Sequence, residues 1–210
     1  MKLTDIHTHR AITDDVYTTI VNCGESTTPE ATNCSVGLHP WMVDDEWMQR
    51  MTAIATAAEA SQVKAIGECG IDLVKGTADE QTQIAVLRKH IELSEGVHKP
   101  LILHIVKGQE AIMRLRKEYA PTQAWIIHGF RGKPQQAMQY INAGFHLSYG
   151  SIFNKEALAT TPIDRLFVES DEADTPLADI YKAIADCLNI STEELATNVE
   201  RNCRNCGLLP

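Results

Sequence analysis

The stretch that decides the fold begins VKAIGE (63–68), continues through a helical pattern from Asp79 to Val97, and ends PLILHI (100–105). Two short β-rich runs that flank one helix form a parallel βαβ unit, because parallel neighbours need a crossover connection. Each run carries a titratable residue near its end, Glu68 in the first and His104 in the second. The stretch therefore predicts a parallel sheet with polar side chains at the carboxyl ends of its strands.

The same alternation extends along the rest of the chain. Further β-rich runs occupy residues 2–7, 17–23, 34–39, 124–130, 145–150 and 165–170. Further helical patterns occupy residues 44–60, 109–119, 134–143, 177–188 and 192–206. Eight strand candidates alternating with helices predict an α/β protein with a (β/α)8, TIM-like barrel fold.

The start of the chain departs from this regular pattern. The connections 10–16 and 24–33 hardly reach the roughly 10–12 residues that a crossover with its helix needs. We therefore expect an irregular barrel in which the first one or two helices are shortened or missing. A doubly wound sheet is the alternative.

Composition sets the class of protein. A chain of 210 residues that is 44% hydrophobic can bury a substantial core, and we expect residues 1–210 to form a single domain.

No apolar run is long enough to span a membrane and no export signal stands at the start, so we expect a cytoplasmic protein with no membrane partner. The six cysteines, including the Cys203/Cys206 pair, are then expected to be reduced thiols. The net charge of −9 argues against a surface that coats nucleic acid, but it leaves room for a phosphate-bearing substrate in a local cationic pocket.

Six titratable residues stand at or near the carboxyl ends of the predicted strands. They are His7, His9, Glu68, His104, His128 and Asp171. In a (β/α)8 barrel these ends form the face that carries active sites. His7 and His9 project from the same side of one strand because side chains alternate, so both can reach one ion.

This set of four imidazoles and two carboxylates predicts a metal centre. Mixed nitrogen and oxygen donors suit divalent ions, and we expect Zn, Mg or Mn. Six donors exceed the three of a usual catalytic zinc site, which predicts two divalent metal ions that together activate water.

Other residues near the strand ends keep more than one interpretation. His39 in GLHPW can be a metal ligand, a substrate contact or a strand-end polar residue. Asp72 and Glu169 can orient ligand imidazoles, and Asp5 shares the facing of His7. The aromatic residues that can stack on a substrate ring or pack in the core are Trp41, Phe130 and Phe153. The histidines expected to lie outside the site are His90, His98 and His146, the first two as solvent-exposed residues.

Basic residues follow several of the ligand-bearing strands. Arg10 follows His9, Lys107 follows His104, and Arg131 and Lys133 follow His128. A metal site bordered by cations suits an anionic substrate, and phosphate is the anion we expect. Arg10, Lys107 and Arg131, with His39, are the predicted substrate-binding residues.

The ordered motifs DIHTH, GLHPW, IGECGID, PLILHI, IIHGFRG, LSYGSIF and VESD resemble the TatD family of metal-dependent hydrolases and deoxyribonucleases, within the amidohydrolase-like superfamily. The resemblance runs from about residue 5 to residue 171, with a weaker echo over 198–209. It implies a TIM barrel and a phosphodiesterase that trims DNA, often single strands from the 3′ end. It also implies that His7, His9 and Asp171 hold one metal, that His104 and His128 hold the other, and that Glu68 bridges them. Asp171 and Glu68 are the implied catalytic residues.

The chain departs from the family pattern around the metal ligands. Ile105 and Val106 stand where the family has Ser-Arg, Arg131 replaces a small polar residue, and the closing motif 169–173 lacks the proline of the family pattern. All the metal ligands are kept, so hydrolysis is expected. The changes fall on the residues expected to contact phosphate, and these set the substrate.

Three other functions remain open from the sequence. A PHP-type phosphoesterase also opens with a DxHxH-like stretch, but it would need a late Asp-x-His, and no histidine follows His146. An amidohydrolase acting on a substrate other than nucleic acid would carry a bridging lysine where this chain has Glu68. The third is a metal-binding protein without catalysis, which broken metal ligands would favour.

Overall fold

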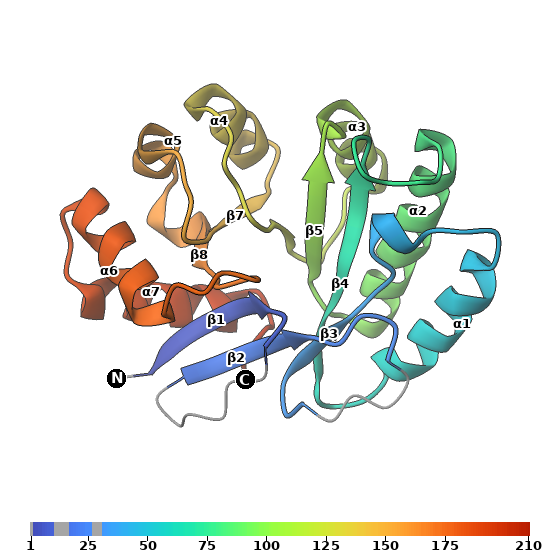
Figure 1. Cartoon of the computed structure of the whole chain (residues 1–210), viewed down its shortest axis with the longest axis horizontal. Helices are drawn as coiled ribbons and strands as arrows, with labels where there is room; N and C mark the ends of the chain where they lie inside the picture. Colours follow the sequence, from blue (N-terminus) through green and yellow to red (C-terminus); the bar gives the residue numbers. More distant parts are fainter. Residues whose placement is uncertain (1, 11–16, 27–30) are drawn as a thin grey trace. The chain divides into compact units, whose positions relative to one another are not determined.

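The computed structural model describes residues 2–10, 17–26 and 31–210 (Figure 1). Its eight strands are parallel neighbours in sequence order within one sheet. They are β1 (Leu3–Thr8), β2 (Tyr17–Asn22), β3 (Cys34–Val36), β4 (Val63–Asp72), β5 (Leu101–Val106), β6 (Trp125–Ile127), β7 (His146–Tyr149) and β8 (Leu166–Val168). Every predicted strand is therefore present.

The helices follow the predicted pattern with one addition. They are α1 (Trp47–Ala58), α2 (Glu80–Val97), α3 (Gln109–Tyr119), α4 (Pro134–Asn142), α5 (Lys155–Thr160), α6 (Leu177–Leu188) and α7 (Thr192–Asn205), with 3₁₀ turns η1 (Pro40–Met42) and η2 (Ile163–Arg165). The sequence did not predict α5. No helix lies in the described parts of the connections from β1 to β2 and from β2 to β3, while 11–16 and 27–30 lie outside the described residues.

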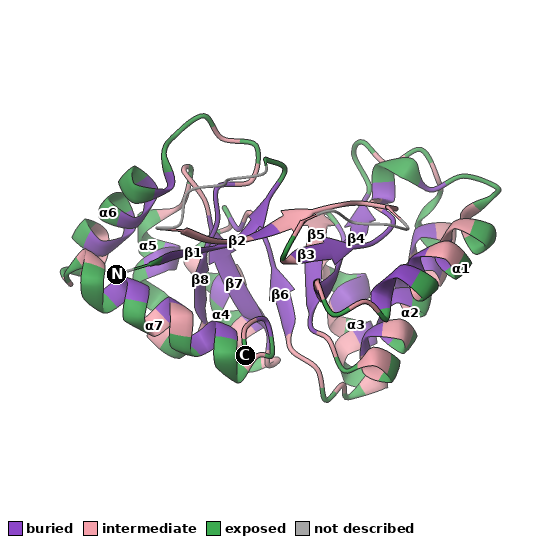
Figure 2. Ribbon diagram, turned by 90° about the horizontal axis from the view of Figure 1, so that it is seen from below, coloured by how far each residue is buried: buried purple, intermediate pink, exposed green. Residues whose placement is uncertain are grey.

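The chain folds as two compact units. One, the split unit, contains residues 1–21 and 126–210, and the other, the continuous unit, contains residues 22–125. The expectation of a single domain stays a prediction. Figure 2 shows buried residues along the strands and on one side of the larger helices, which is the pattern of helices packed on a sheet.

In the split unit, β1 is the strand on which the site is built. It pairs in parallel with β2, and on its other side Asp171 N donates to the His7 carbonyl (2.9 Å) while His9 N donates to the Asp171 carbonyl (3.2 Å). Ile6, Leu147 and Phe167 are fully buried in the core of this unit. The main chain after β8 is thereby fixed beside the end of β1.

In the continuous unit, β4 pairs with β3 on one side and β5 on the other. The helix α2 that connects β4 to β5 begins at Asp79, whose side chain accepts a hydrogen bond from Thr82 N (2.7 Å) as an N-cap. Val36, Ile66 and Leu101 are fully buried in this core. The register sets Gly70 beside His104 and Asp72 beside Val106.

Among the described residues, no helix combines the length and the apolar character needed to cross a bilayer.

Candidate metal centre

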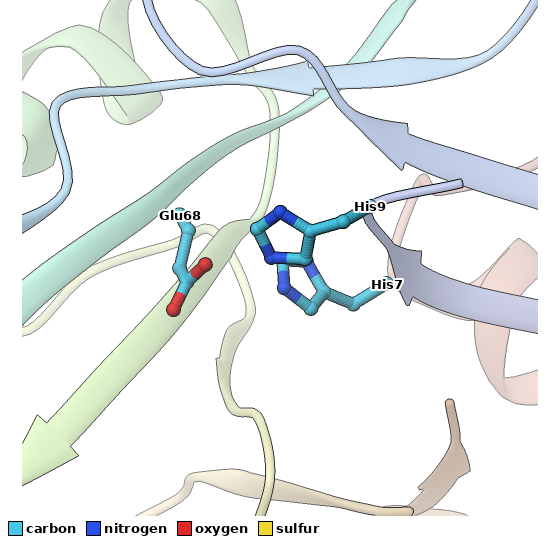
Figure 3. A group of neighbouring side chains, drawn as sticks. All are labelled: His7, His9 and Glu68. Carbon is cyan, nitrogen blue, oxygen red and sulfur yellow. The ribbon is translucent and has the colours of Figure 1, made fainter. Parts of the chain in front are cut away.

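The end of β1 carries the two histidines that the sequence singled out. Figure 3 shows the His7 and His9 side chains extending in the same direction from their strand, as alternation of side chains requires. Asp171 Oδ1 lies 3.7 Å from His7 Nε2 and 3.6 Å from His9 Nε2. Asp171 has a positive φ of 54°, a backbone conformation that aspartate adopts more readily than most residues.

A third imidazole joins this group. The rings of His7 and His128 have centroids 4.5 Å apart, and one donor atom each of His7, His128 and Asp171 lies within 4.8 Å of the others. Glu169 Oε1 lies 3.4 Å from His128 Nδ1 and accepts a hydrogen bond from Gly129 N (2.6 Å). Burial raises the pKa of Glu169, but the neighbouring His128 and His7 lower it more, so the net pKa falls below its ordinary value. Glu169 is therefore a carboxylate that lies against the imidazole of His128, a candidate metal ligand.

The Asp5 side chain forms hydrogen bonds with two segments of the split unit. Its Oδ1 accepts hydrogen bonds from Ser170 N (3.0 Å) and His7 N (3.3 Å), and its Oδ2 accepts one from Ser170 Oγ (2.6 Å). Burial raises the pKa of Asp5 to about 7 against the opposing effect of these hydrogen bonds. Asp5 thus links the main chain of β1 to the segment after β8, and this link fixes the position of Ser170, the residue before Asp171.

The continuous unit holds a second group of donors. Glu68 Oε1 lies 2.9 Å from His104 Nδ1 and 3.1 Å from His39 Nε2, and the three residues offer donor atoms within 4.8 Å of one another. Glu68, which Figure 3 shows projecting from β4, is 4% exposed. Asn22 Nδ2 donates a hydrogen bond to Glu68 Oε2 (3.2 Å).

Asp72 contacts a member of this second group, the His104 ring. Its Oδ2 lies 3.1 Å from His104 Nε2 and accepts a hydrogen bond from Trp41 Nε1 (2.6 Å), while its Oδ1 accepts from Val74 N and Lys75 N. Burial raises the pKa of Asp72, but the hydrogen bonds from Trp41, Lys75, Val74 and His104 bring it down to about 2. A carboxylate that is ionised at neutral pH therefore fixes the orientation of the His104 ring.

Both groups fit divalent ions. The separations of 3.6 and 3.7 Å around Asp171 exceed a hydrogen bond, yet donors about 2.0–2.2 Å from a tetrahedral ion lie roughly 3.3–3.6 Å apart. In the second group the imidazole and carboxylate donors lie within hydrogen-bond distance of one another. Imidazole and carboxylate are again ligand types that bind divalent ions. The two groups are called here the β1 cluster (His7, His9, His128, Asp171) and the β4 cluster (His39, Glu68, His104).

The structure corrects two sequence interpretations. Glu68 does not close its strand, because β4 continues to Asp72. His90 is not solvent-exposed but fully buried in α2, where its Nε2 accepts a hydrogen bond from Leu38 N (3.0 Å). A histidine on an amphipathic helix gave no sign of a partner 52 residues earlier in the chain.

The predicted substrate-binding residues have different environments. Arg10 forms an ion pair with Asp174 (2.7 Å) and donates a hydrogen bond to the Glu172 carbonyl (3.2 Å). Lys107 and Arg131 are exposed, and His39 belongs to the β4 cluster. The sequence missed Asn22 as a partner of Glu68, and the only available signal was its place at the end of a predicted strand.

The sheet, its connecting helices and these two clusters define the chain as an α/β protein of the TIM-like (β/α)8 class with candidate metal-binding groups. A family model described as TatD related DNase matches residues 11–206. The chain belongs to this family.

Relatives and solved structures agree with this assignment. The metal-dependent hydrolase YjjV of Escherichia coli (strain K12) is 26% identical over 152 residues, which cover 68% of this chain and 59% of the relative. The 3'-5' ssDNA/RNA exonuclease TatD of Erwinia billingiae (strain Eb661) is 23% identical over 146 residues, covering 65% of this chain and 56% of the relative. The chain thus spans somewhat more than half the length of these two relatives. The crystal structure of a hydrolase TatD family protein from Entamoeba histolytica superposes with a TM-score of 0.78 at 17% identity and covers 98% of both chains, so the fold is shared.

Proposed function

We propose that this protein is a divalent-metal-dependent phosphodiesterase that uses two metal ions and acts as a deoxyribonuclease on single strands. The observation that carries the proposal is the pair of imidazole and carboxylate clusters, one in each unit. Membership of the TatD related DNase family and the exonuclease name of the Erwinia relative support it. Because that name includes RNA, single-stranded RNA is a second candidate substrate of the same chemistry.

The two clusters assign the proposed ligands. In the split unit His7, His9 and Asp171 hold one ion, and His128 lies close enough to His7 and Asp171 to join them. In the continuous unit Glu68 and His104 hold the other, and His39 contacts the same Glu68 oxygen as His104. The bridging role of Glu68, and the place of His128 beside His104, stay predictions from the family resemblance.

Divalent ions at such sites supply Lewis acidity, which polarises a phosphoryl oxygen and makes water a better nucleophile. The protein's own residues do the rest. Asp171, with 29% of its side chain exposed, is the proposed acceptor of the proton of the attacking water. Glu169 and Asp72 keep the rings of His128 and His104 in place. The exposed cations Lys107 and Arg131 are the proposed contacts for phosphate.

Metal analysis of the purified protein tests the first part of this proposal. Wild-type protein should bind about two divalent ions per chain, and His7→Ala with His9→Ala should lose one of them, because the double change removes two of the proposed ligands of the β1 cluster. His98→Asn is the matched control, since His98 is an exposed residue in a left-handed conformation that asparagine tolerates. A wild-type protein without bound metal, or a double variant that keeps the full amount, would contradict the proposal.

A substrate panel tests the second part. The metal-loaded protein should cleave single-stranded DNA or RNA faster than phosphomonoesters and carboxylic esters, because two clusters of ligands suit an in-line displacement at phosphorus. The chelated protein and the His7→Ala, His9→Ala variant serve as controls. Hydrolysis confined to esters or amides would favour an amidohydrolase instead.

A further inference from the structure

Trp41 is an aromatic residue held at the edge of the β4 cluster while 41% of it stays exposed. Its main-chain N donates a hydrogen bond to His39 Nδ1 (3.1 Å), and its indole Nε1 donates one to Asp72 Oδ2 (2.6 Å). His39 and Asp72 in turn contact Glu68 and His104. The indole is therefore fixed by the groups that position the metal ligands.

The surroundings of the ring combine aromatic surface with positive charge. The Trp41 ring centroid lies 4.7 Å from that of His39 and 5.7 Å from that of His104. Lys75 Nζ lies 4.5 Å from the Trp41 ring centroid on an exposed side chain. Both residues are tied to Asp72, Trp41 through its indole and Lys75 through its main-chain N.

A tryptophan that packs a core is buried, whereas this one is fixed and solvent-accessible. The contrast with Phe130 is direct, because Phe130 is 5% exposed and packs against Tyr140 and Tyr149. A rigid indole presents a large flat surface at little further entropic cost, and every nucleobase can stack on such a surface. An ammonium beside it suits the phosphate to which the base is attached.

We propose that Trp41 contacts the substrate by stacking on the base of the nucleotide whose phosphate lies at the β4 cluster, with Lys75 turned to that phosphate. The inference rests on the proposed phosphodiesterase function and narrows it to substrates that carry a heterocyclic base. Trp41 then sets specificity, and the metal ligands carry out the cleavage.

A kinetic comparison of two oligonucleotides tests the proposal. Trp41→Leu should raise KM for an oligothymidylate about tenfold, the size of one lost base–aromatic contact, and leave KM for an abasic oligomer of equal length unchanged. Trp41→Phe keeps a ring and should retain most of the affinity. Met48→Ala, at another exposed apolar residue of the same unit, should behave as wild type. An equal effect of Trp41→Leu on both substrates would overturn the proposal.

A binding measurement tests it without turnover. Thymidine 5′-monophosphate should quench wild-type tryptophan fluorescence saturably and ribose 5-phosphate should not, while Trp41→Phe, which keeps Trp47 and Trp125, should lose the response. Quenching that is the same in Trp41→Phe, or absent from the wild type, would refute a stacking role. If neither oligomer is cleaved, the phosphodiesterase proposal fails, and the fluorescence result still decides the role of Trp41.

Discussion

His90 illustrates how a single buried imidazole supports the β4 cluster. Its Nε2 accepts a hydrogen bond from Leu38 N, the residue before His39, and its Nδ1 lies 3.0 Å from the Val86 carbonyl. Both bonds are satisfied at once by a neutral ring with its proton on Nδ1. Burial lowers the pKa of His90 to about 4, although the bond to Val86 opposes the shift.

The depressed pKa of His90 predicts a loss of stability in weak acid. Below about pH 6.5 the His90 side chain is protonated in the unfolded chain but stays neutral in the folded one. The free energy of unfolding therefore falls as pH drops, and it levels off below the folded pKa of about 4. Between pH 6.5 and pH 4 the protonation of His90 in the unfolded chain lowers the free energy of unfolding by about 3 kcal/mol.

Denaturant unfolding at a series of pH values measures this contribution. Wild-type stability should fall more steeply than that of His90→Gln between pH 6.5 and pH 4, and the two slopes should agree above pH 7. Parallel curves across the whole range would show that His90 is not the group responsible.

Arg10 is a residue whose ion-pair partner could not be predicted from the sequence. Arg10, one of the predicted substrate-binding residues, pairs with Asp174, 164 residues away in the sequence. Its contact with substrate stays a prediction, and the ion pair depends on where the chain returns after β8. Long-range pairing of this kind has no local pattern.

At the level of elements, the contact between β4 and β5 is sensitive to one glycine. Gly70 has a φ of +151°, and a Cβ added there would overlap the His104 carbonyl oxygen. Gly70→Ala should therefore push β5 away and displace His104 from Glu68. Gly96, in α2, has open space around its Cα, so Gly96→Ala should be neutral or raise the free energy of unfolding by about 1 kcal/mol.

Metal titration of the two glycine variants checks this expectation. Gly70→Ala should bind one ion fewer than wild type and keep the ion of the β1 cluster, whereas Gly96→Ala should bind as wild type does. Wild-type metal content in Gly70→Ala would mean that the strands can adjust without moving His104.

The elements themselves were largely predictable because their signals are local. Alternating apolar residues and N-caps located the strands and the longer helices, so the expected helix over 79–97 begins within one residue of α2. The short helix α5 (Lys155–Thr160) was not predicted because its six residues make fewer than two turns, too few to show a helical period. The end of β4 was predicted four residues too early, because β4 continues through Gly70, where β5 approaches closely, to Asp72.

The residues of the candidate site could be named from the sequence, but the neighbours of each donor could not. Period-two alternation placed His7 and His9 on one side of β1, and strand ends supplied the other donors. Which donor meets which depends on distances between strands, and these brought His128 toward His7 and His39 toward Glu68. The roles of Asn22 and Trp41 depend on the same distances.

For the molecule as a whole, bound metal should act as a stabilising ligand. An ion present at 100 times its Kd raises the free energy of unfolding by about 2.7 kcal/mol, which corresponds to roughly 5–10 °C in Tm for a chain of this size. Calorimetry with manganese or zinc against a chelator measures the shift. His98→Asn should show the full shift and His7→Ala with His9→Ala a smaller one, while identical Tm values with and without metal would argue against ligation by the native fold.

The division of the chain into two units also affects the order in which the two clusters are completed during synthesis. Residues 22–125 form one continuous stretch, so the β4 cluster has all its members once Trp125 has left the ribosome. His7 and His9 are made before the other donors, yet their carboxylate partner Asp171 is made much later. If both clusters bind metal as proposed, the β1 cluster is completed only when Asp171 has been made, and we expect the β4 cluster to be able to bind an ion earlier during synthesis.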